Sequence, residues 1–239
     1  MSLPAGAQVF DDVPLAIDPD EILRFQGYKK GVDVPTADVR ALFDEALREG
    51  YRLMAPRAVV SWLPVRARDA GRLDVGDVTL AIPSIGERWG AVDHVAAAVC
   101  TIGEALERRV AALWEARELP LASMLDSVGS GAVESLAEYV NDVLCQQGLA
   151  AGLRVTNRIS PGYADWDVAE QLALFRLRPG QPAGVTLNDA CFMTPGKSIS
   201  LLVGAGAEAR VDHYFSQCAR CWMRDCAYRR APAPRTVHR

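Results

Sequence analysis

The chain has 239 residues, of which 50% are hydrophobic, and a formal net charge of −4, so it has enough apolar residues for one full hydrophobic core. Its 26 basic residues are scattered until the C-terminal stretch, which argues against nucleic acid as the main partner. No apolar run reaches the roughly 18 to 20 residues that cross a bilayer and the N-terminus lacks a signal-peptide pattern, so we expect a cytoplasmic protein that does not bind membranes.

The N-terminal part, residues 1–55, is predicted to be helical. Asp18 fits the N-cap of a short helix, with Pro19 at the first helical position and Gly27 after its end. A second amphipathic helix is expected to begin at Thr36 and to stop at Gly50.

The central part, residues 56–215, mixes strand and helix patterns. We expect strands over 58–65 and 77–82, joined by a charged loop, and a buried strand in "DHVAAAVCTIG". Helical spacing of apolar residues follows over 102–113 and 120–147. The segments "VTLNDACFM" and "SISLLVG" are the last expected strands. The pattern predicts an α+β fold, an antiparallel or mixed twisted sheet with flanking helices, because no regular βαβ alternation or glycine-rich dinucleotide turn is present.

One short stretch, "RISPGYADWD" from Arg158 to Asp167, has the composition of a ligand-binding turn. Pro161 and Gly162 favour a tight turn, and Gly162 allows a ligand to approach the backbone. Arg158 offers a planar cation for a carboxylate, and Tyr163 offers a ring and a hydroxyl. The alternative is that Arg158 forms a surface ion pair and Tyr163 covers the core.

Three blocks of the sequence resemble the activation (reactivation) domain of cobalamin-dependent methionine synthase. "RISPGY" is similar to the Arg-x-x-x-Gly-Tyr opening of that domain's S-adenosylmethionine motif. "GVTLNDACFMTPGKSIS" resembles its strand-turn-strand segment, and "MLDSVGSGAVESLAEYV" resembles its long helix. The resemblance covers roughly residues 90–205 and extends weakly to the N-terminal "AIDPDEILRFQGY". It implies a stand-alone relative of this domain.

The resemblance assigns a ligand-binding role to six residues. Arg158 would face the carboxylate of S-adenosylmethionine, and Glu134 would bind its amino group or ribose. The other residues implied are Ser160, Gly162 and Tyr163 in the turn and Asp18 near the N-terminus. For two of the six a simpler explanation exists, because Glu134 shares a stripe with Glu138 and Asp142 that suits a solvated helix face, and Asp18 already serves as a helix cap.

The chain also departs from the family pattern. After Gly-Tyr the family continues with two prolines and a histidine, whereas residues 164–169 here are "ADWDVA". The large modules of the synthase, including a corrinoid-binding Asp-x-His-x-x-Gly motif, have no counterpart in this sequence. Any cobalamin would therefore have to be carried by a partner protein.

Residues 216–230 contain Cys218, Cys221 and Cys226 in the spacing Cys-x2-Cys-x4-Cys, which the methionine synthase domain does not carry at its end. Three thiolates this close together suit a metal site. Zinc would require a fourth ligand, for which Cys191 or His213 is available, and a [4Fe-4S] cluster would use the three cysteines alone or add Cys191. Ordinary reduced thiols are the alternative. The final residues, 231–239, are expected to be disordered.

The leading hypothesis is a protein that binds S-adenosylmethionine and supports the reductive reactivation of a partner's corrinoid cofactor. The partner would be a corrinoid protein or cobalamin-dependent methyltransferase, and a flavodoxin- or ferredoxin-type reductant would supply the electron. A second hypothesis is a metal-binding accessory or electron-transfer protein that relies on the three clustered cysteines. A third is a free-standing enzyme that uses S-adenosylmethionine on a small substrate.

Overall fold

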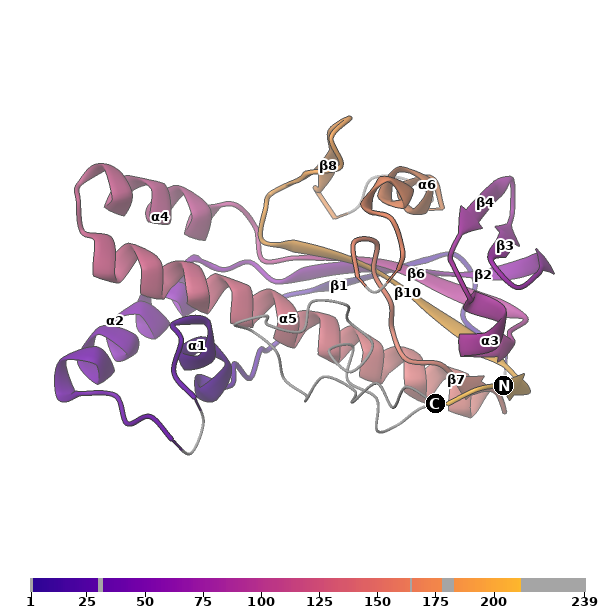
Figure 1. Cartoon of the computed structure of the whole chain (residues 1–239), viewed down its shortest axis with the longest axis horizontal. Helices are drawn as coiled ribbons and strands as arrows, with labels where there is room; N and C mark the ends of the chain where they lie inside the picture. Colours follow the sequence, from indigo (N-terminus) through magenta and orange to yellow (C-terminus); the bar gives the residue numbers. More distant parts are fainter. Residues whose placement is uncertain (1, 30–31, 164, 178–182, 212–239) are drawn as a thin grey trace, which may run out of the picture.

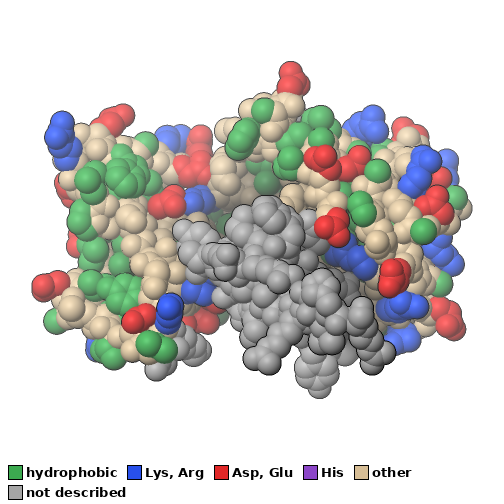
Figure 2. Space-filling model, viewed as in Figure 1, with side chains coloured by type: hydrophobic (Ala, Val, Ile, Leu, Met, Phe, Trp, Pro, Cys, Tyr) green, Lys and Arg blue, Asp and Glu red, His purple; other side chains and the backbone are tan. Residues whose placement is uncertain are grey.

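The computed structural model describes residues 2–29, 32–163, 165–177 and 183–211. Figure 1 shows a central sheet with the long helix α5 running along it, helices α1, α2 and α4 around the N-terminal half of α5, and the shorter helices α3 and α6 towards the opposite end. Acidic and basic side chains are intermixed over the visible face (Figure 2). The arrangement is an α+β fold with a mainly antiparallel sheet and flanking helices, as the sequence predicts.

The elements have the following bounds. The helices are α1 Pro19–Phe25, α2 Ala37–Leu53, α3 Ile85–Trp89, α4 Ala105–Glu115, α5 Leu119–Ala150 and α6 Gln171–Arg176, with a 3-10 turn, η1, at Val168–Glu170. The longer strands are β1 Ala7–Asp11, β2 Arg57–Arg68, β3 Arg72–Val75, β4 Val78–Ala81, β6 His94–Thr101 and β10 Ser198–Gly206. Two-residue strands are β5 Gly90–Ala91, β7 Arg154–Val155, β8 Thr186–Leu187, β9 Met193–Thr194 and β11 Glu208–Ala209.

The main sheet has the order β4-β3-β2-β6-β10-β7, and β1 pairs with β2 outside this path. The paired strands run antiparallel to each other. Strand β2 serves two neighbours on one side, because its first half pairs with β1 and its second half with β3. The change occurs where Pro64 withholds a backbone donor and the register shifts between Val65 and Ala67.

The sheet separates two apolar cores. On one face, side chains such as Cys100 and Leu201 pack beneath α5 against Leu136 and Val140. On the other face, α3, α6 and the loops around them cover the sheet, and Trp166 joins this core. A third cluster holds α1, α2 and α4 to the N-terminal half of α5.

The two N-terminal helices begin where the sequence predicts. The carboxylate of Asp18 caps α1 by accepting the Asp20 N–H at 2.9 Å, and the Thr36 hydroxyl caps α2. The predicted stop at Gly50 is wrong, since α2 continues to Leu53. A Cβ on Gly50 would lie 2.6 Å from Cγ1 of Val128, so this glycine permits close helix packing and does not end the helix.

Three strand predictions need correction. The expected charged loop between 65 and 77 contains β3, and the N-terminal segment contributes β1, whose short alternation of polar and apolar residues was missed. The segment "VTLNDACFM" forms the two-stranded hairpin β8–β9 and not one strand, because the Asn188 side chain accepts the N–H groups of Ala190 and Phe192 and closes a turn. The strands predicted in 58–65, 77–82, "DHVAAAVCTIG" and "SISLLVG" are confirmed as β2, β4, β6 and β10.

The predicted long helix is confirmed as α5, which is longer than expected at 32 residues. Near the C-terminus of α5 the row of buried residues shifts by one position, so that Leu144 is buried and the expected Val143 is only partly buried. No helix of the described residues is long and apolar enough to cross a membrane. The predicted segments 216–230 and 231–239 lie outside the described residues.

Candidate functional site

Residues 154–159 form the edge of the sheet that carries the candidate site. Strand β7 pairs with the end of β10, Thr156 donates its N–H to the Gly204 carbonyl at 2.9 Å, and Ile159 bridges to Leu202. Ile159 packs into the core opposite α5. Because neighbouring residues of an extended chain point to opposite faces, Arg158 is directed towards α5.

Arg158 contacts Glu134 of α5 in an ion pair. The distance from Arg158 Nη2 to Glu134 Oε2 is 2.7 Å, and the two side chains are only 19% and 27% exposed. The structure thus brings together two residues that the sequence singled out separately. The simpler explanation for Glu134, a solvated stripe, fits Glu138 and Asp142, which are exposed, better than it fits Glu134 itself.

The turn after Arg158 is closed by its own backbone. The Tyr163 N–H donates to the Ser160 carbonyl, and the Gly162 N–H donates to the Trp166 carbonyl at 2.8 Å. Gly162 has a φ of +87°, in the region that favours glycine. Ser160 is buried, whereas Tyr163 is 55% exposed and presents its ring at the surface. The alternative role of Tyr163 as a cover for the core does not fit this exposure.

In the segment that departs from the family pattern, residues 164–169, Trp166 and Asp167 have structural roles. Trp166 is 2% exposed and lies in the core opposite α5, and its Nε1 has no hydrogen-bond partner among the described residues. Asp167 caps η1 by accepting the Ala169 N–H at 2.9 Å. Asp165 and Asp167 are both exposed. Trp166 therefore anchors the turn in the core and is not available to stack on a ligand.

Asp18 is exposed and caps α1, as described above. Its segment nevertheless lies against the part of α5 that carries Glu134. The Ser135 hydroxyl donates to the Ala16 carbonyl at 3.2 Å, and a Cβ on Gly131 would lie 3.3 Å from Ile17. The N-terminal segment is therefore a neighbour of the candidate site, while its ligand contact stays a prediction.

A second cluster, around Lys197, includes two α5 residues that lie about one and two helical turns before Glu134, and the sequence analysis missed it. Lys197, between β9 and β10, places its Nζ 2.8 Å from Asp126 Oδ1 and 2.9 Å from the Ser130 hydroxyl of α5. Its backbone N–H donates to the Glu107 carboxylate of α4. The available signal was the four-residue spacing of Asp126, Ser130 and Glu134, which puts them on one helix face.

Cys100 lies in β6 on the face of the sheet beneath α5 and is fully buried. Burial raises the pKa of its thiol to about 12, the positive charge of Arg158 opposes this rise, and Glu134 adds to it. Both members of the ion pair are therefore within electrostatic reach of a thiol that stays protonated and uncharged at neutral pH.

The predicted metal ligands Cys218, Cys221 and Cys226 lie outside the described residues, as does His213. Cys191 is buried, with a φ of +64°. Within the described ranges, no group of three or more His, Cys, Asp or Glu side chains is placed to hold a metal ion. The zinc or iron–sulfur site therefore stays a prediction.

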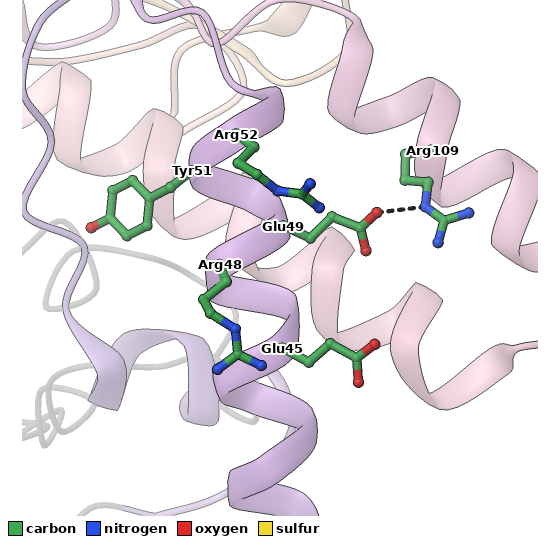
Figure 3. A pocket seen from close by; sticks show the side chains of 6 residues that line it. All are labelled: Glu45, Arg48, Glu49, Tyr51, Arg52 and Arg109. Carbon is green, nitrogen blue, oxygen red and sulfur yellow. Dashed lines mark hydrogen bonds and ion pairs between the residues drawn. The ribbon is translucent and has the colours of Figure 1, made fainter.

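A pocket of about 730 Å³ lies elsewhere, between α2 and α4. Figure 3 shows acidic and basic side chains alternating along α2, with Glu49 bound to Arg109 of α4 at 2.7 Å. Its lining residues are Glu45, Arg48, Glu49, Tyr51, Arg52 and Arg109, none of which belongs to the predicted ligand set. Charged side chains at this spacing are ordinary on a solvated helix. The Arg158–Glu134 pair is therefore the more specific candidate for a ligand site.

No family model matches the sequence, and no curated protein is similar to it at the sequence level. Among solved structures, the chain is similar to one described as the "Crystal Structure of the MetH Reactivation Domain bound to AdoHcy". The TM-score is 0.66 at 15% sequence identity, and the match covers 89% of this chain and 81% of the other. At this identity the comparison shows the fold: the chain has a fold like that of the MetH reactivation domain.

Proposed function

We propose that the chain binds S-adenosylmethionine at the Arg158–Glu134 edge and supports the reductive reactivation of a corrinoid held by a partner protein. The observation that carries the proposal is the ion pair itself, which joins an edge turn to the long helix at 2.7 Å in a fold similar to an AdoHcy-bound domain. The sequence resemblance assigns Arg158 to the ligand's carboxylate and Glu134 to its amino group or ribose.

The charges of the pair suit an amino-acid group. A ligand that carries a carboxylate and an ammonium can replace Glu134 at Arg158 and replace Arg158 at Glu134, so that neither buried charge loses its partner. A simple anion could replace Glu134 alone, and a simple cation could replace Arg158 alone. The exposed ring of Tyr163 beside the turn offers a flat surface for the adenine.

The proposed contribution to the reaction is positional. Bound S-adenosylmethionine supplies the methyl group, and the chain holds it so that the partner's corrin can approach. This transfer requires no general acid or base, which agrees with the neutral Cys100 thiol and with the three histidines of the whole chain. In this proposal the cobalamin is carried by a partner protein.

Titration calorimetry with S-adenosylmethionine tests the binding step. Arg158→Ala is expected to weaken binding by more than about 1 kcal/mol, because a charge-assisted pair is lost. Arg57→Ala removes a more exposed arginine–carboxylate pair, with Asp11 at 2.5 Å between β2 and β1, and as the control it should bind normally. Absence of binding by the wild-type chain at millimolar ligand would refute the proposal.

The reactivation step has its own test. The chain is added to a Co(II) corrinoid protein with a reductant and S-adenosylmethionine, and the methylcobalamin spectrum is followed. Faster formation with the wild type than with Arg158→Ala supports the role. Binding of S-adenosylmethionine without any methylcobalamin would favour the alternative of a free-standing enzyme that acts on a small substrate.

A further inference from the structure

Lys197 is held more firmly than a surface lysine. Its ammonium contacts Asp126 and Ser130 of α5, its backbone N–H binds Glu107 of α4, and its carbonyl accepts the Ile102 N–H at 3.2 Å. The side chain is 17% exposed. Lys197 therefore ties the turn between β9 and β10 to two helices and to the end of β6.

Two glycines make room for this arrangement. A Cβ on Gly129 would lie 3.3 Å from Cε of Lys197, and a Cβ on Gly196 would lie 3.2 Å from Oε1 of Glu107. Any larger residue at either position would press on the lysine or its partner. The local sequence thus accommodates one specific placement of the Lys197 side chain.

The lysine lies next to the candidate site. Asp126, Ser130 and Glu134 follow each other at four-residue spacing, so that Ser130 and Glu134 are about 6 Å apart on one face of α5. Lys197 holds the first two residues of this face and Arg158 holds the third. Lys197 and Arg158, which come from different segments, therefore bind residues in neighbouring turns of α5, on the same face of the helix.

We propose that Lys197 is a positioning residue for the ligand site, an inference that rests on the function proposed above. When a ligand separates Arg158 from Glu134, one of the two contacts on this helix face is given up. The contacts of Lys197 with Asp126 and Ser130 remain, and they keep the turn around residues 194–198 against α5, one helical turn before Glu134. The carboxylate of Glu134 then stays oriented towards the ligand's ammonium.

A purely electrostatic role for Lys197 makes different predictions. Removing a positive charge near a sulfonium would strengthen binding of S-adenosylmethionine, and removing the charge of Asp126 would weaken it. The uncharged thioether of S-adenosylhomocysteine would respond little to either change. A positioning role instead predicts that loss of either partner weakens both ligands.

The test measures the dissociation constants of both ligands for Lys197→Met, Asp126→Asn and Lys197→Arg, with Arg57→Met as control. We expect Lys197→Met and Asp126→Asn to weaken both ligands by at least about fivefold, while Lys197→Arg and Arg57→Met stay within about threefold of wild type. Thermal unfolding of each variant shows that it is folded, and Asp126→Asn, which breaks the same ion pair, retains the test if Lys197→Met does not fold.

Unchanged affinities, or opposite shifts of S-adenosylmethionine affinity in Lys197→Met and Asp126→Asn, would overturn the positioning role. If the wild type binds and only Arg158→Ala is weakened, this inference fails and the proposed function stands. If the wild type binds neither ligand, the proposed function fails first and this inference with it.

Discussion

The two faces of the sheet are covered in different ways. One face lies under a single 32-residue helix, α5, and its edge carries the Arg158–Glu134 pair. The other is covered by short helices, loops and the buried Trp166. Arg158 and Ile159 are adjacent in sequence yet serve these different faces. The long helix α5 holds charged groups in fixed positions, whereas the short helices and loops on the other face can adjust to the core that they cover.

Trp166 tests how much the second face depends on one side chain. Trp166→Ala should lower the free energy of unfolding by about 3 to 5 kcal/mol, because a large buried ring is lost. Trp166→Phe should cost clearly less, since it also removes the unpaired Nε1–H. Urea unfolding measures both. Equal losses would mean that the indole nitrogen has a partner that offsets its burial.

Leu201 and Leu202 compare the two faces directly, because they are neighbours, are both fully buried and belong to opposite cores. Each Leu→Ala change should cost about 2 to 5 kcal/mol, with the larger loss for Leu201→Ala. The long helix cannot collapse into the cavity, whereas short elements can relax. Urea unfolding of the two variants decides the order, and a larger loss for Leu202→Ala would reverse the comparison.

The buried thiol of Cys100 probes the face beneath α5 through the pH dependence of stability, an effect that is absent at neutral pH. Its pKa lies at about 12 in the folded chain and near the ordinary 9.0 when unfolded. The unfolded state therefore releases the proton first, so stability is fully present below pH 9 and falls as the pH rises towards 12. The slope should reach about 1.4 kcal/mol per pH unit, and Cys100→Ala should remove this contribution.

Thiol labelling provides the control for that prediction. Cys145, on α5, is only half-buried, and burial raises its pKa less strongly. Cys145 should react with an alkylating reagent in the folded protein, and Cys100 should react only on unfolding. Rapid labelling of Cys100 in the folded state would show that the α5 face opens locally.

Much of the fold could be read from local patterns. The Asp18 and Thr36 caps, the apolar run of β6 and the periodicity of α5 each determine their element within a few residues, because the signals are near in sequence. The prediction that α2 stops at Gly50 was wrong because the role of this glycine depends on a residue that is distant in sequence. Its role is to admit Val128 of another helix, which no local pattern shows.

For the candidate site, the sequence determined which residue types were available, and the tertiary structure decided which of them meet. Arg158, Gly162 and Tyr163 stood out by their chemistry, and the alternation of an extended edge then directed Arg158 to Glu134. The burial of Trp166 and the placement of Lys197 on Asp126 and Ser130 depended on packing between distant segments. Local propensity acts over a few residues, whereas burial and ion pairing are set by the neighbours that the whole fold supplies.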